Sequence, residues 1–355
     1  MGAYQVPTDA PESDGTLKWD STTLVLVRLD CQEHTGLGYS YAHASVASLI
    51  HSKLRPVVEG RDPFEGPALW LEMLDCLRNL GRPGLTSYGV AAVDVALWDL
   101  KARLLGLPLV DLLGRARSSI PIYGSGGFTS YDLVRLREQL SGWVDEGISM
   151  VKMKVGRHPE DDPERVRVAR QAIGDGPDLF VDANGGYRRK QALELARRFH
   201  EEAGVSWFEE PVPSDDLAGL RLIRDRGPAG LDVTAGEYGY RLVYFRRMLE
   251  AGAVDVMQAD ATRCAGVTGF LQVAALCRAF QVPLSAHCAP TLHASVCCAC
   301  LPVCHLEYFH DHVRIEQMLF DGVPALRQGG LVPALDRPGL GIEFRERDAQ
   351  RFAVN

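Results

Sequence analysis

Lysines, carboxylates and a histidine recur through the second half of the sequence at a regular interval. In chain order they are Lys152, Lys154, Asp182, Glu209, Glu237, Asp260, His287 and Glu307. From Lys154 onward, each lies 20 to 28 residues after the one before it, about the length of one strand and one helix. Because ionisable side chains are rarely buried without partners, we expect this series to converge on one reactive pocket.

Three of these carboxylates have the composition of a magnesium site. Unpaired, Asp182, Glu209 and Glu237 would repel one another, and each would raise the pKa of the others. A divalent cation removes that repulsion, and Mg²⁺ prefers a few carboxylates together with water and substrate oxygens. The sequence therefore predicts that these three residues hold one Mg²⁺ ion.

Asp260 and His287 form a second candidate unit. A carboxylate that accepts a hydrogen bond from one imidazole nitrogen fixes the tautomer and makes the other nitrogen a better base. His287 is singled out because it ends a predicted strand. We expect His287 to move a proton, with Asp260 supporting it.

The elements that must position these residues alternate between strands and helices. Short β-rich segments begin near residues 120, 150, 179, 207, 232, 255, 282 and 305, and helix-like stretches between them include 131–145, 160–174, 188–203 and 265–280. Such alternation predicts parallel strands with right-handed crossovers, and eight units can close into a barrel. The alternative is an open doubly wound sheet, but no glycine-rich phosphate loop supports nucleotide binding.

Strand geometry predicts which neighbours face the barrel interior. Alternation places Lys152 and Lys154 on one face, with Met153 on the other. On the next strand but one, Trp207 and Glu209 are expected to point inward, and Phe208 to face the surrounding helices. The first third of the chain is less regular, with a strand expected at 23–31, a helix at 68–80 and a long helix at 86–105.

The ordered set of motifs resembles the enolase superfamily, specifically its mandelate racemase subgroup (mandelate racemase/muconate lactonizing enzyme-like). The matching pieces are Lys152-Met153-Lys154, Val181-Asp182-Ala183-Asn184, Trp207-Phe208-Glu209-Glu210-Pro211, Gly236-Glu237, Asp260 with Gly266-Val267-Thr268-Gly269, Ser285-Ala286-His287, His305-Leu306-Glu307, and the cap-helix stretch Tyr88–Asp99. The resemblance implies an α/β fold, a modified (β/α)7β TIM-like barrel with an α+β cap. It implies a cap over residues 1–115, a barrel over 116–318 and a tail over 319–355 that completes the cap.

By the same resemblance the charged residues receive roles in removing the proton next to a substrate carboxylate. Lys154 would be the base on one face of the substrate, and Lys152 would lower the pKa of Lys154 and touch the carboxylate. His287, supported by Asp260, would act on the opposite face. Glu307 would donate a hydrogen bond to the substrate carboxylate as charge grows there, and Mg²⁺ would stabilise the enediolate.

Bases on both faces are compatible with three outcomes. We favour dehydration of an acid sugar (an aldonate or aldarate), which makes the protein a lyase. Racemisation or epimerisation of a 2-hydroxy acid and cycloisomerisation are the isomerase alternatives. The non-enzyme alternative is an inactive barrel used as a binding protein, which the complete polar set disfavours because unpaired buried charge is costly.

Substrate choice is expected to lie with cap loops 8–21 and 39–43 and with side chains around the barrel mouth. The candidates are Trp19, His43, Tyr123, Asn184, Tyr238 and Arg263. Arg263 stands where the subgroup often has Lys. The chain also reaches its first β-rich segment, residues 3–7, almost at once, so we expect either a shortened N-terminus or a missing cap strand.

Composition narrows the remaining function classes. A formal net charge of −8 argues against nucleic acid as a partner, and no apolar run approaches the roughly 20 residues that span a bilayer. No signal peptide is evident, so we expect a reducing cytoplasmic location, a small carboxylate substrate and a homo-oligomer. Five of the nine cysteines crowd into residues 288–304, which predicts buried apolar packing in a helix in preference to a soft-metal site.

Overall fold

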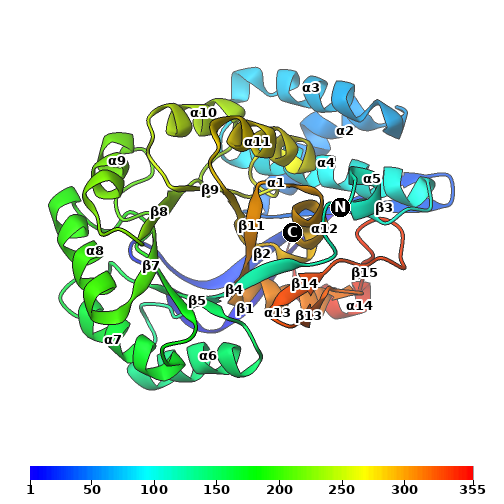
Figure 1. Ribbon diagram of the computed structural model, residues 1–355. Coiled ribbons are helices and arrows are strands. Elements are labelled where there is room, and N and C mark those ends of the chain that lie inside the picture. Colours follow the sequence, from blue (N-terminus) through cyan, green and yellow to red (C-terminus); the bar gives the residue numbers. More distant parts are fainter. Residues whose placement is uncertain (355) are drawn as a thin grey trace.

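The computed structural model describes residues 1–354, and its centre is a closed barrel of eight parallel strands. The ring closes because the last strand pairs with the first as well as with its predecessor (Figure 1). The strands are β4 (Ile120–Gly126), β5 (Met150–Lys154), β6 (Asp178–Asp182), β7 (Val205–Glu209), β8 (Asp232–Ala235), β9 (Val256–Ala259), β10 (Leu284–Ala286) and β11 (Val303–Phe309). The barrel prediction is confirmed, and the open doubly wound alternative is wrong.

A helix follows each barrel strand, and these helices cover the outside of the barrel. They are α6 (Leu133–Asp145), α7 (Asp162–Ile173), α8 (Arg189–Ala203), α9 (Leu217–Arg226), α10 (Leu242–Glu250), α11 (Gly266–Phe280), α12 (Pro290–Ala299) and α13 (His310–Leu319). In α8 the buried residues Ala192, Leu195, Ala196 and Phe199 follow the three-to-four spacing of one helix face. Because every strand runs the same way, their carboxyl ends meet at one end of the barrel.

Side chains on β7 face the directions that strand alternation predicts. Phe208 packs outward against Phe199 of α8, with ring centroids 5.9 Å apart. Trp207 points inward and stacks on Phe180, with centroids 5.2 Å apart. These two inward rings cluster with Tyr123 and Val256, so an apolar layer fills the barrel interior.

The N-terminal part of the chain forms an antiparallel sheet with helices packed on it. The sheet order is β16 (Ala353–Val354), β1 (Gly2–Ser13), β2 (Lys18–Cys31) and β3 (His34–Tyr41). The helices are α1 (Ser45–Leu49), the π-helical turn Ile50–Leu54, α2 (Arg55–Val58), the short 3₁₀ turns Pro63–Glu65 and Arg78–Leu80, α3 (Gly66–Cys76), α4 (Leu85–Leu104) and α5 (Leu109–Leu113). Residues 3–7 therefore lie in a cap strand, and the helix expected over 68–80 divides into α3 and a 3₁₀ turn.

The long helix α4 lies directly on the cap sheet and on the barrel. A Cβ at Gly38 would meet the Ala92 carbonyl oxygen at 2.1 Å, so only glycine allows this approach. On the barrel side, Asp94 accepts hydrogen bonds from the backbone N–H and the hydroxyl of Thr268, at 2.9 and 2.6 Å, at the start of α11. Burial raises the pKa of Asp94 to about 7. These contacts fix the cap against the barrel.

The C-terminal tail contacts both parts of the molecule. Its elements are β12 (Phe320–Asp321), β13 (Ala325–Arg327), β14 (Gly330–Val332), β15 (Glu343–Phe344), α14 (Glu346–Ala349), the 3₁₀ turn Gln350–Phe352 and β16. Strand β14 pairs antiparallel with β4 of the barrel, and β16 pairs with β1 of the cap. The tail thus joins the first barrel strand to the edge of the cap sheet.

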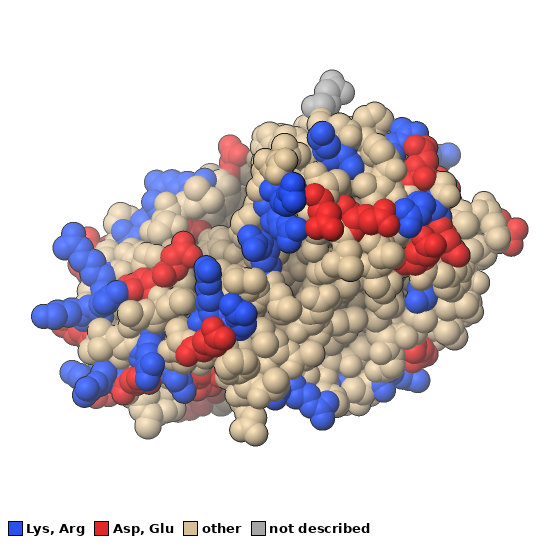
Figure 2. All heavy atoms as spheres, turned by 90° about the horizontal axis from the view of Figure 1, so that it is seen from above, with Lys and Arg blue, Asp and Glu red and all other residues tan. Residues whose placement is uncertain are grey.

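The outer surface shows both charge signs side by side. On the face in Figure 2, Lys and Arg side chains alternate with Asp and Glu, and the described residues there form no continuous basic surface. Within residues 1–354, no helix combines the length and the apolar character needed to cross a bilayer.

Candidate active site

The predicted acidic residues meet at the carboxyl ends of neighbouring barrel strands. Asp182 ends β6, Glu209 ends β7 and Glu237 follows β8, and one oxygen of each lies within 4.8 Å of the other two. All three side chains are buried. Among residues 1–354, Glu209 Oε1 and Glu237 Oε2 have no hydrogen-bond partner. Closely spaced carboxylate oxygens without donors fit a hard divalent cation such as Mg²⁺.

The two lysines of β5 contact this acidic cluster from one side. Lys152 Nζ lies 2.5 Å from Glu209 Oε2 and 2.7 Å from Glu307 Oε1, and Lys154 donates to Asp182. Burial and Lys152 both lower the pKa of Lys154, but Asp182, Glu209 and Glu237 together outweigh them, so its pKa is raised. Lys152 thus acts on Lys154 in the expected direction, while the three carboxylates stabilise the ammonium.

The histidine and its partner contact the cluster from the other side. His287 Nδ1 lies 2.9 Å from Asp260 Oδ2, and Nε2 lies 3.7 Å from Glu237 Oε2. Although burial opposes ionisation, the hydrogen bond from His287 lowers the pKa of Asp260. An ionised Asp260 holds a proton on Nδ1, so Nε2 is the nitrogen that faces the site and can exchange a proton. Arg263 lies against the same carboxylates, 3.2 Å from Glu237 Oε1 and 3.6 Å from Asp260 Oδ2.

Glu307 joins the two sides of the site. Its Oε1 accepts a hydrogen bond from the Ser125 hydroxyl at 2.6 Å, and its Oε2 lies 3.7 Å from His287 Nε2. Burial opposes ionisation, but Lys152 and His287 hold the pKa of Glu307 well below its usual range. Sequence reasoning missed Ser125, although its position on β4, two residues from Tyr123, indicates the same inward face.

The turn between β1 and β2 lies within the predicted cap loop 8–21 and covers the barrel end, but sequence reasoning missed the contacts that hold it there. A Cβ at Gly15 would meet the Ala183 carbonyl oxygen at 2.2 Å, so the turn rests directly on the end of β6. Arg157 donates to the carbonyl oxygens of Asp14 and Leu17, at 2.9 and 2.7 Å. Figure 1 shows this blue hairpin passing across the barrel. We call residues 12–19 the covering turn.

Trp19 and Glu12 belong to the covering turn. Trp19 Nε1 donates to Glu12 Oε2 at 2.9 Å, and the indole ring meets Phe128 edge-on, with centroids 5.5 Å apart. Burial and Asp311 raise the pKa of Glu12 to about 9, so this carboxyl group is neutral near pH 7. The predicted substrate contact Trp19 thus lies in the segment that closes over the site.

The other predicted substrate contacts lie at different depths. The backbone N–H of Asn184 donates to Asp182 Oδ1 at 2.8 Å, and Tyr238 stacks near Arg263, whose guanidinium carbon is 5.5 Å from the ring centroid. Tyr123 is fully buried in the barrel interior, and Lys152 Nζ lies 5.2 Å from its ring centroid. His43 is exposed, and its hydrogen bonds run to Ser45 at the start of α1.

Three strand ends at the site hold non-glycine residues in the left-handed backbone region. They are Asn184 after β6 (φ 44°), Glu210 after β7 (φ 40°) and Cys288 after β10 (φ 53°). Such conformations cost free energy and persist where surrounding structure enforces them, often at functional sites. Each redirects the chain one or two residues after a predicted catalytic or metal-binding residue.

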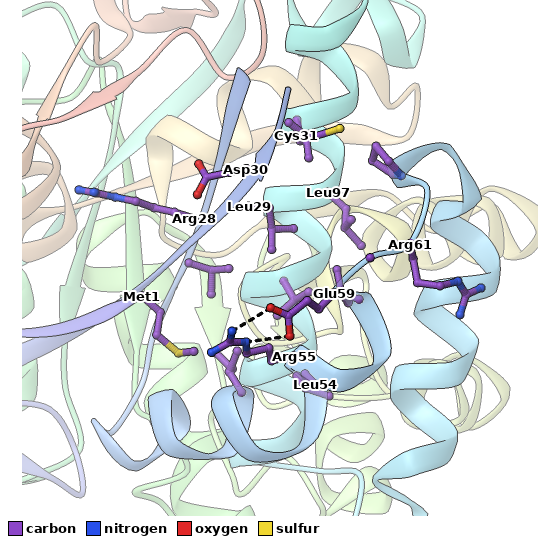
Figure 3. A pocket seen from close by; sticks show the side chains of 17 residues that line it. Met1, Arg28, Leu29, Asp30, Cys31, Leu54, Arg55, Glu59, Arg61 and Leu97 are labelled. Carbon is purple, nitrogen blue, oxygen red and sulfur yellow. Dashed lines mark hydrogen bonds and ion pairs between the residues drawn. The ribbon is translucent and has the colours of Figure 1, made fainter. Parts of the chain in front are cut away.

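Most of the cysteine-rich segment and a cavity in the cap lie apart from this chemistry, but Cys288 contacts His287 and Glu307. Cys297 and Cys298 are buried in α12, which confirms the packing prediction. A cavity of about 690 Å³ in the cap is lined only by residues 1–100, among them Leu54, Leu97 and an Arg55–Glu59 ion pair (Figure 3). It contains none of the predicted site residues.

Comparisons with known proteins match both parts of the chain. Residues 6–114 match the mandelate racemase / muconate lactonizing enzyme N-terminal domain, and residues 135–349 match the enolase C-terminal domain-like family. A 3,6-anhydro-alpha-L-galactonate cycloisomerase from Streptomyces coelicolor is 32% identical over 99% of this chain and 97% of its own length.

A dehydratase and two solved structures are also similar to this chain. The L-talarate/galactarate dehydratase of Salmonella typhimurium is 31% identical over 88% of this chain and 78% of its own. Its structure with Mg and L-lyxarohydroxamate superimposes with a TM-score of 0.90, at 26% identity over 100% of this chain and 91% of that one. A mandelate racemase/muconate lactonizing enzyme-like protein from Rubrobacter xylanophilus superimposes with a TM-score of 0.98, at 56% identity over 99% and 98% of the chains.

Proposed function

Because the chain belongs to the mandelate racemase and muconate lactonizing enzyme family, we propose that it is a Mg²⁺-dependent enzyme acting on acid sugars. It removes the proton at C2, next to the carboxylate, and then expels the oxygen at C3. One observation carries the proposal. The two candidate proton carriers lie at opposite ends of one acidic cluster, Lys154 on Asp182 and His287 near Glu237.

The acidic cluster is the proposed metal site. Asp182, Glu209 and Glu237 would hold Mg²⁺, because their oxygens lie close together and two of them have no donor within residues 1–354. When bound, the ion supplies positive charge where a second negative charge develops on the substrate carboxylate. The Salmonella dehydratase structure contains Mg, which supports the same cofactor here.

Lys154 is the proposed base at C2. Asp182, Glu209 and Glu237 raise its pKa, while burial and Lys152 act in the opposite direction. A cation that shared the charge of these carboxylates would make them stabilise the ammonium less, which would favour release of the proton from Lys154. Lys152, with Glu307 and Ser125 around it, then holds the substrate carboxylate in place.

His287 is the proposed acid for the leaving oxygen. It acts from the face opposite Lys154, and Asp260 fixes Nδ1 so that Nε2 exchanges the proton. When the oxygen at C3 is a hydroxyl, its loss releases water and the reaction is a dehydration. When that oxygen belongs to an anhydro ring, the same elimination opens the ring without losing an atom, which is a cycloisomerisation. The Streptomyces coelicolor cycloisomerase matches this chain over nearly its full length, which supports cycloisomerisation as the second candidate reaction.

Substrate recognition is proposed for side chains at the barrel mouth and in the covering turn. Arg263 and Asn184 are the polar candidates nearest the carboxylates, and Tyr238 adjoins Arg263. Trp19 would close over the sugar from the cap. Tyr123, below Lys152, and His43, at the start of α1, are the more distant candidates.

The oligomeric state and the cellular compartment are each proposed from a single observation. We propose a homo-oligomer, because the cap helices expose the large apolar side chains Phe64, Leu71, Leu80 and Leu85. Sedimentation velocity of the intact protein measures this directly, and a monomer at micromolar concentration would contradict it. A cytoplasmic location fits nine unpaired cysteines within residues 1–354.

The function is tested by product analysis on a panel of aldonates, aldarates and anhydro-aldonates, with and without Mg²⁺. Dehydration yields a 2-keto acid lighter by one water, and ring opening yields a 2-keto acid of unchanged mass. Both products react with semicarbazide, and mass spectrometry separates them. A product that is only the C2 epimer of its substrate would contradict elimination and favour the racemase alternative.

A further inference from the structure

A second group of metal-binding atoms lies beside the acidic cluster, and the proposed reaction does not use it to hold a metal. The atoms are His287 Nε2, Cys288 Sγ and Glu307 Oε2. The sulfur lies 3.3 Å from the nitrogen and 3.4 Å from the oxygen, and the nitrogen and oxygen are 3.7 Å apart. All three side chains are buried, so they present one nitrogen, one sulfur and one oxygen to a common point.

These separations fit tetrahedral zinc coordination. Zinc binds sulfur at about 2.3 Å and nitrogen or oxygen at about 2.0–2.2 Å, so tetrahedral ligand atoms lie about 3.4–3.6 Å apart. The three measured separations span this range. Thiolate and imidazole ligands favour zinc, whereas Mg²⁺ prefers oxygen ligands alone. The group therefore differs from the acidic cluster in the metal that it selects.

The surrounding side chains orient these atoms as a zinc site requires. Asp260 holds His287 Nδ1 at 2.9 Å, and a carboxylate behind a histidine fixes the tautomer of many zinc-binding imidazoles. Lys152 and Ser125 occupy Glu307 Oε1, while Oε2 accepts a hydrogen bond from the backbone N–H of Cys288 at 3.2 Å and has a second lone pair that can bind a cation. Glu237 Oε2, which has no hydrogen bond within residues 1–354, faces the same space at 3.7 Å from His287 Nε2.

We propose that His287, Cys288 and Glu307 form a site for Zn²⁺ or a similarly soft divalent cation, and that its occupation inhibits the enzyme. The Cys288 thiol releases its proton to solvent when the metal–sulfur bond forms. Zinc on His287 Nε2 occupies the lone pair that proton transfer needs. The inhibitory part rests on the proposed function, but the binding part does not.

The binding part is tested by titrating the Mg²⁺-saturated protein with Zn²⁺ in a calorimeter and with Co²⁺ in an absorption spectrometer. We expect one zinc ion per chain and a near-ultraviolet thiolate-to-cobalt charge-transfer band. Cys288→Ser replaces a thiolate by a neutral hydroxyl, so it should weaken zinc binding by more than about tenfold and remove the band. Equal affinity in Cys288→Ser, or no zinc binding by the wild type, would overturn the proposal.

Two controls separate this site from other thiols and from the magnesium site. Cys76→Ser removes an exposed thiol elsewhere and should leave zinc affinity unchanged. Asp182→Asn should weaken Mg²⁺ binding and keep the zinc isotherm, and loss of both would mean that the two sites are one. Cys288→Ala, checked by circular dichroism, repeats the test if the serine variant misfolds.

Inhibition is measured separately as the zinc concentration that halves each protein's own zinc-free rate. That concentration should rise more than about tenfold in Cys288→Ser, in proportion to the loss of affinity. If no acid sugar is turned over, the proposed function fails while the zinc titration still stands. If zinc binds and the rate is unaffected, the inhibitory part fails alone.

Discussion

The barrel end and the covering turn are held in place by different kinds of contact. At the barrel end, charged side chains are fixed by one another, as Lys152 is by Glu209 and Glu307. The covering turn is held mainly through backbone atoms, with Gly15 against the Ala183 carbonyl. This difference suggests that the barrel end carries the proposed catalytic side chains. Side chains of the covering turn can change, and the proposed substrate with them, while backbone contacts still hold the turn against the barrel.

The first prediction concerns the Mg²⁺ affinity of the barrel end after a proposed metal ligand is removed. Glu209→Gln should weaken Mg²⁺ affinity by more than about a hundredfold, since a direct ligand matters at least as much as the groups behind it. Isothermal titration with Mg²⁺ measures the effect. Glu210→Gln is the matched control. Burial and Glu237 raise the pKa of Glu210, and Glu210 is not one of the three clustered carboxylates, so an equal loss there would contradict the assignment.

The second prediction concerns Asp260, which is proposed to act only through His287. Asp260→Asn leaves the volume unchanged but no longer fixes the proton on His287 Nδ1, so kcat should fall about 10- to 100-fold. The pH–rate profile should also shift, which a merely structural role would not produce. Thr262→Ala removes one hydrogen bond to Asp260, from a hydroxyl 2.7 Å away, and should have a smaller effect. Equal effects in the two variants would show that packing alone is being measured.

The third change addresses the covering turn. Gly15→Val places side-chain atoms where the Ala183 carbonyl lies, so the turn must lift from the end of β6. We expect kcat/KM to fall about tenfold through poorer closure, with Mg²⁺ affinity unchanged. Gly66→Val, at a cap glycine with nothing within 4 Å of its Cβ position and, like Gly15, no left-handed backbone, controls for introducing a valine elsewhere in the cap. Loss of metal affinity in Gly15→Val would show that the two regions are not independent.

The smallest expected effect concerns the neutral carboxyl group of the covering turn. Burial and Asp311 raise the pKa of Glu12 to about 9 in the folded protein, against 4.5 as the ordinary value. The contribution of Glu12 to the stability of the folded protein is thus fully present below pH 4.5 and declines as pH rises toward 9. Glu12→Gln should remove this part of the pH dependence, so the Tm of the variant minus that of the wild type should increase between pH 6 and pH 9. A constant Tm difference across that range would refute the neutral carboxyl group.

The sequence predicts the barrel end better than the cap, for a physical reason. Strand alternation and the interval between charged residues are local patterns, and they placed Lys152, Lys154 and Glu209 correctly on inward faces. The contact of Gly15 with Ala183 is not local. It depends on how the hairpin folds back over the barrel, and no periodicity near residue 15 encodes that.

Electrostatics was the other limit. The sequence places Lys152 beside Lys154 and so predicts a lowered pKa, but it does not show that Asp182 lies closest to Lys154. In the structure that carboxylate, together with Glu209 and Glu237, outweighs burial and the neighbouring ammonium. Cys288 illustrates the same limit, since its sulfur meets His287 and Glu307 only because its backbone is left-handed and β11 lies alongside.

Lys154 and His287 are proposed to serve one proton-transfer site beside Mg²⁺. NMR detection of deuterium incorporated at C2 of an acid sugar, in D₂O with Mg²⁺, measures that proton transfer. We expect exchange or turnover in the wild type, and a loss of about 10²- to 10⁴-fold in Lys154→Ala and in His287→Ala for the step each residue serves. Exchange that continues at the wild-type rate in both variants would contradict it.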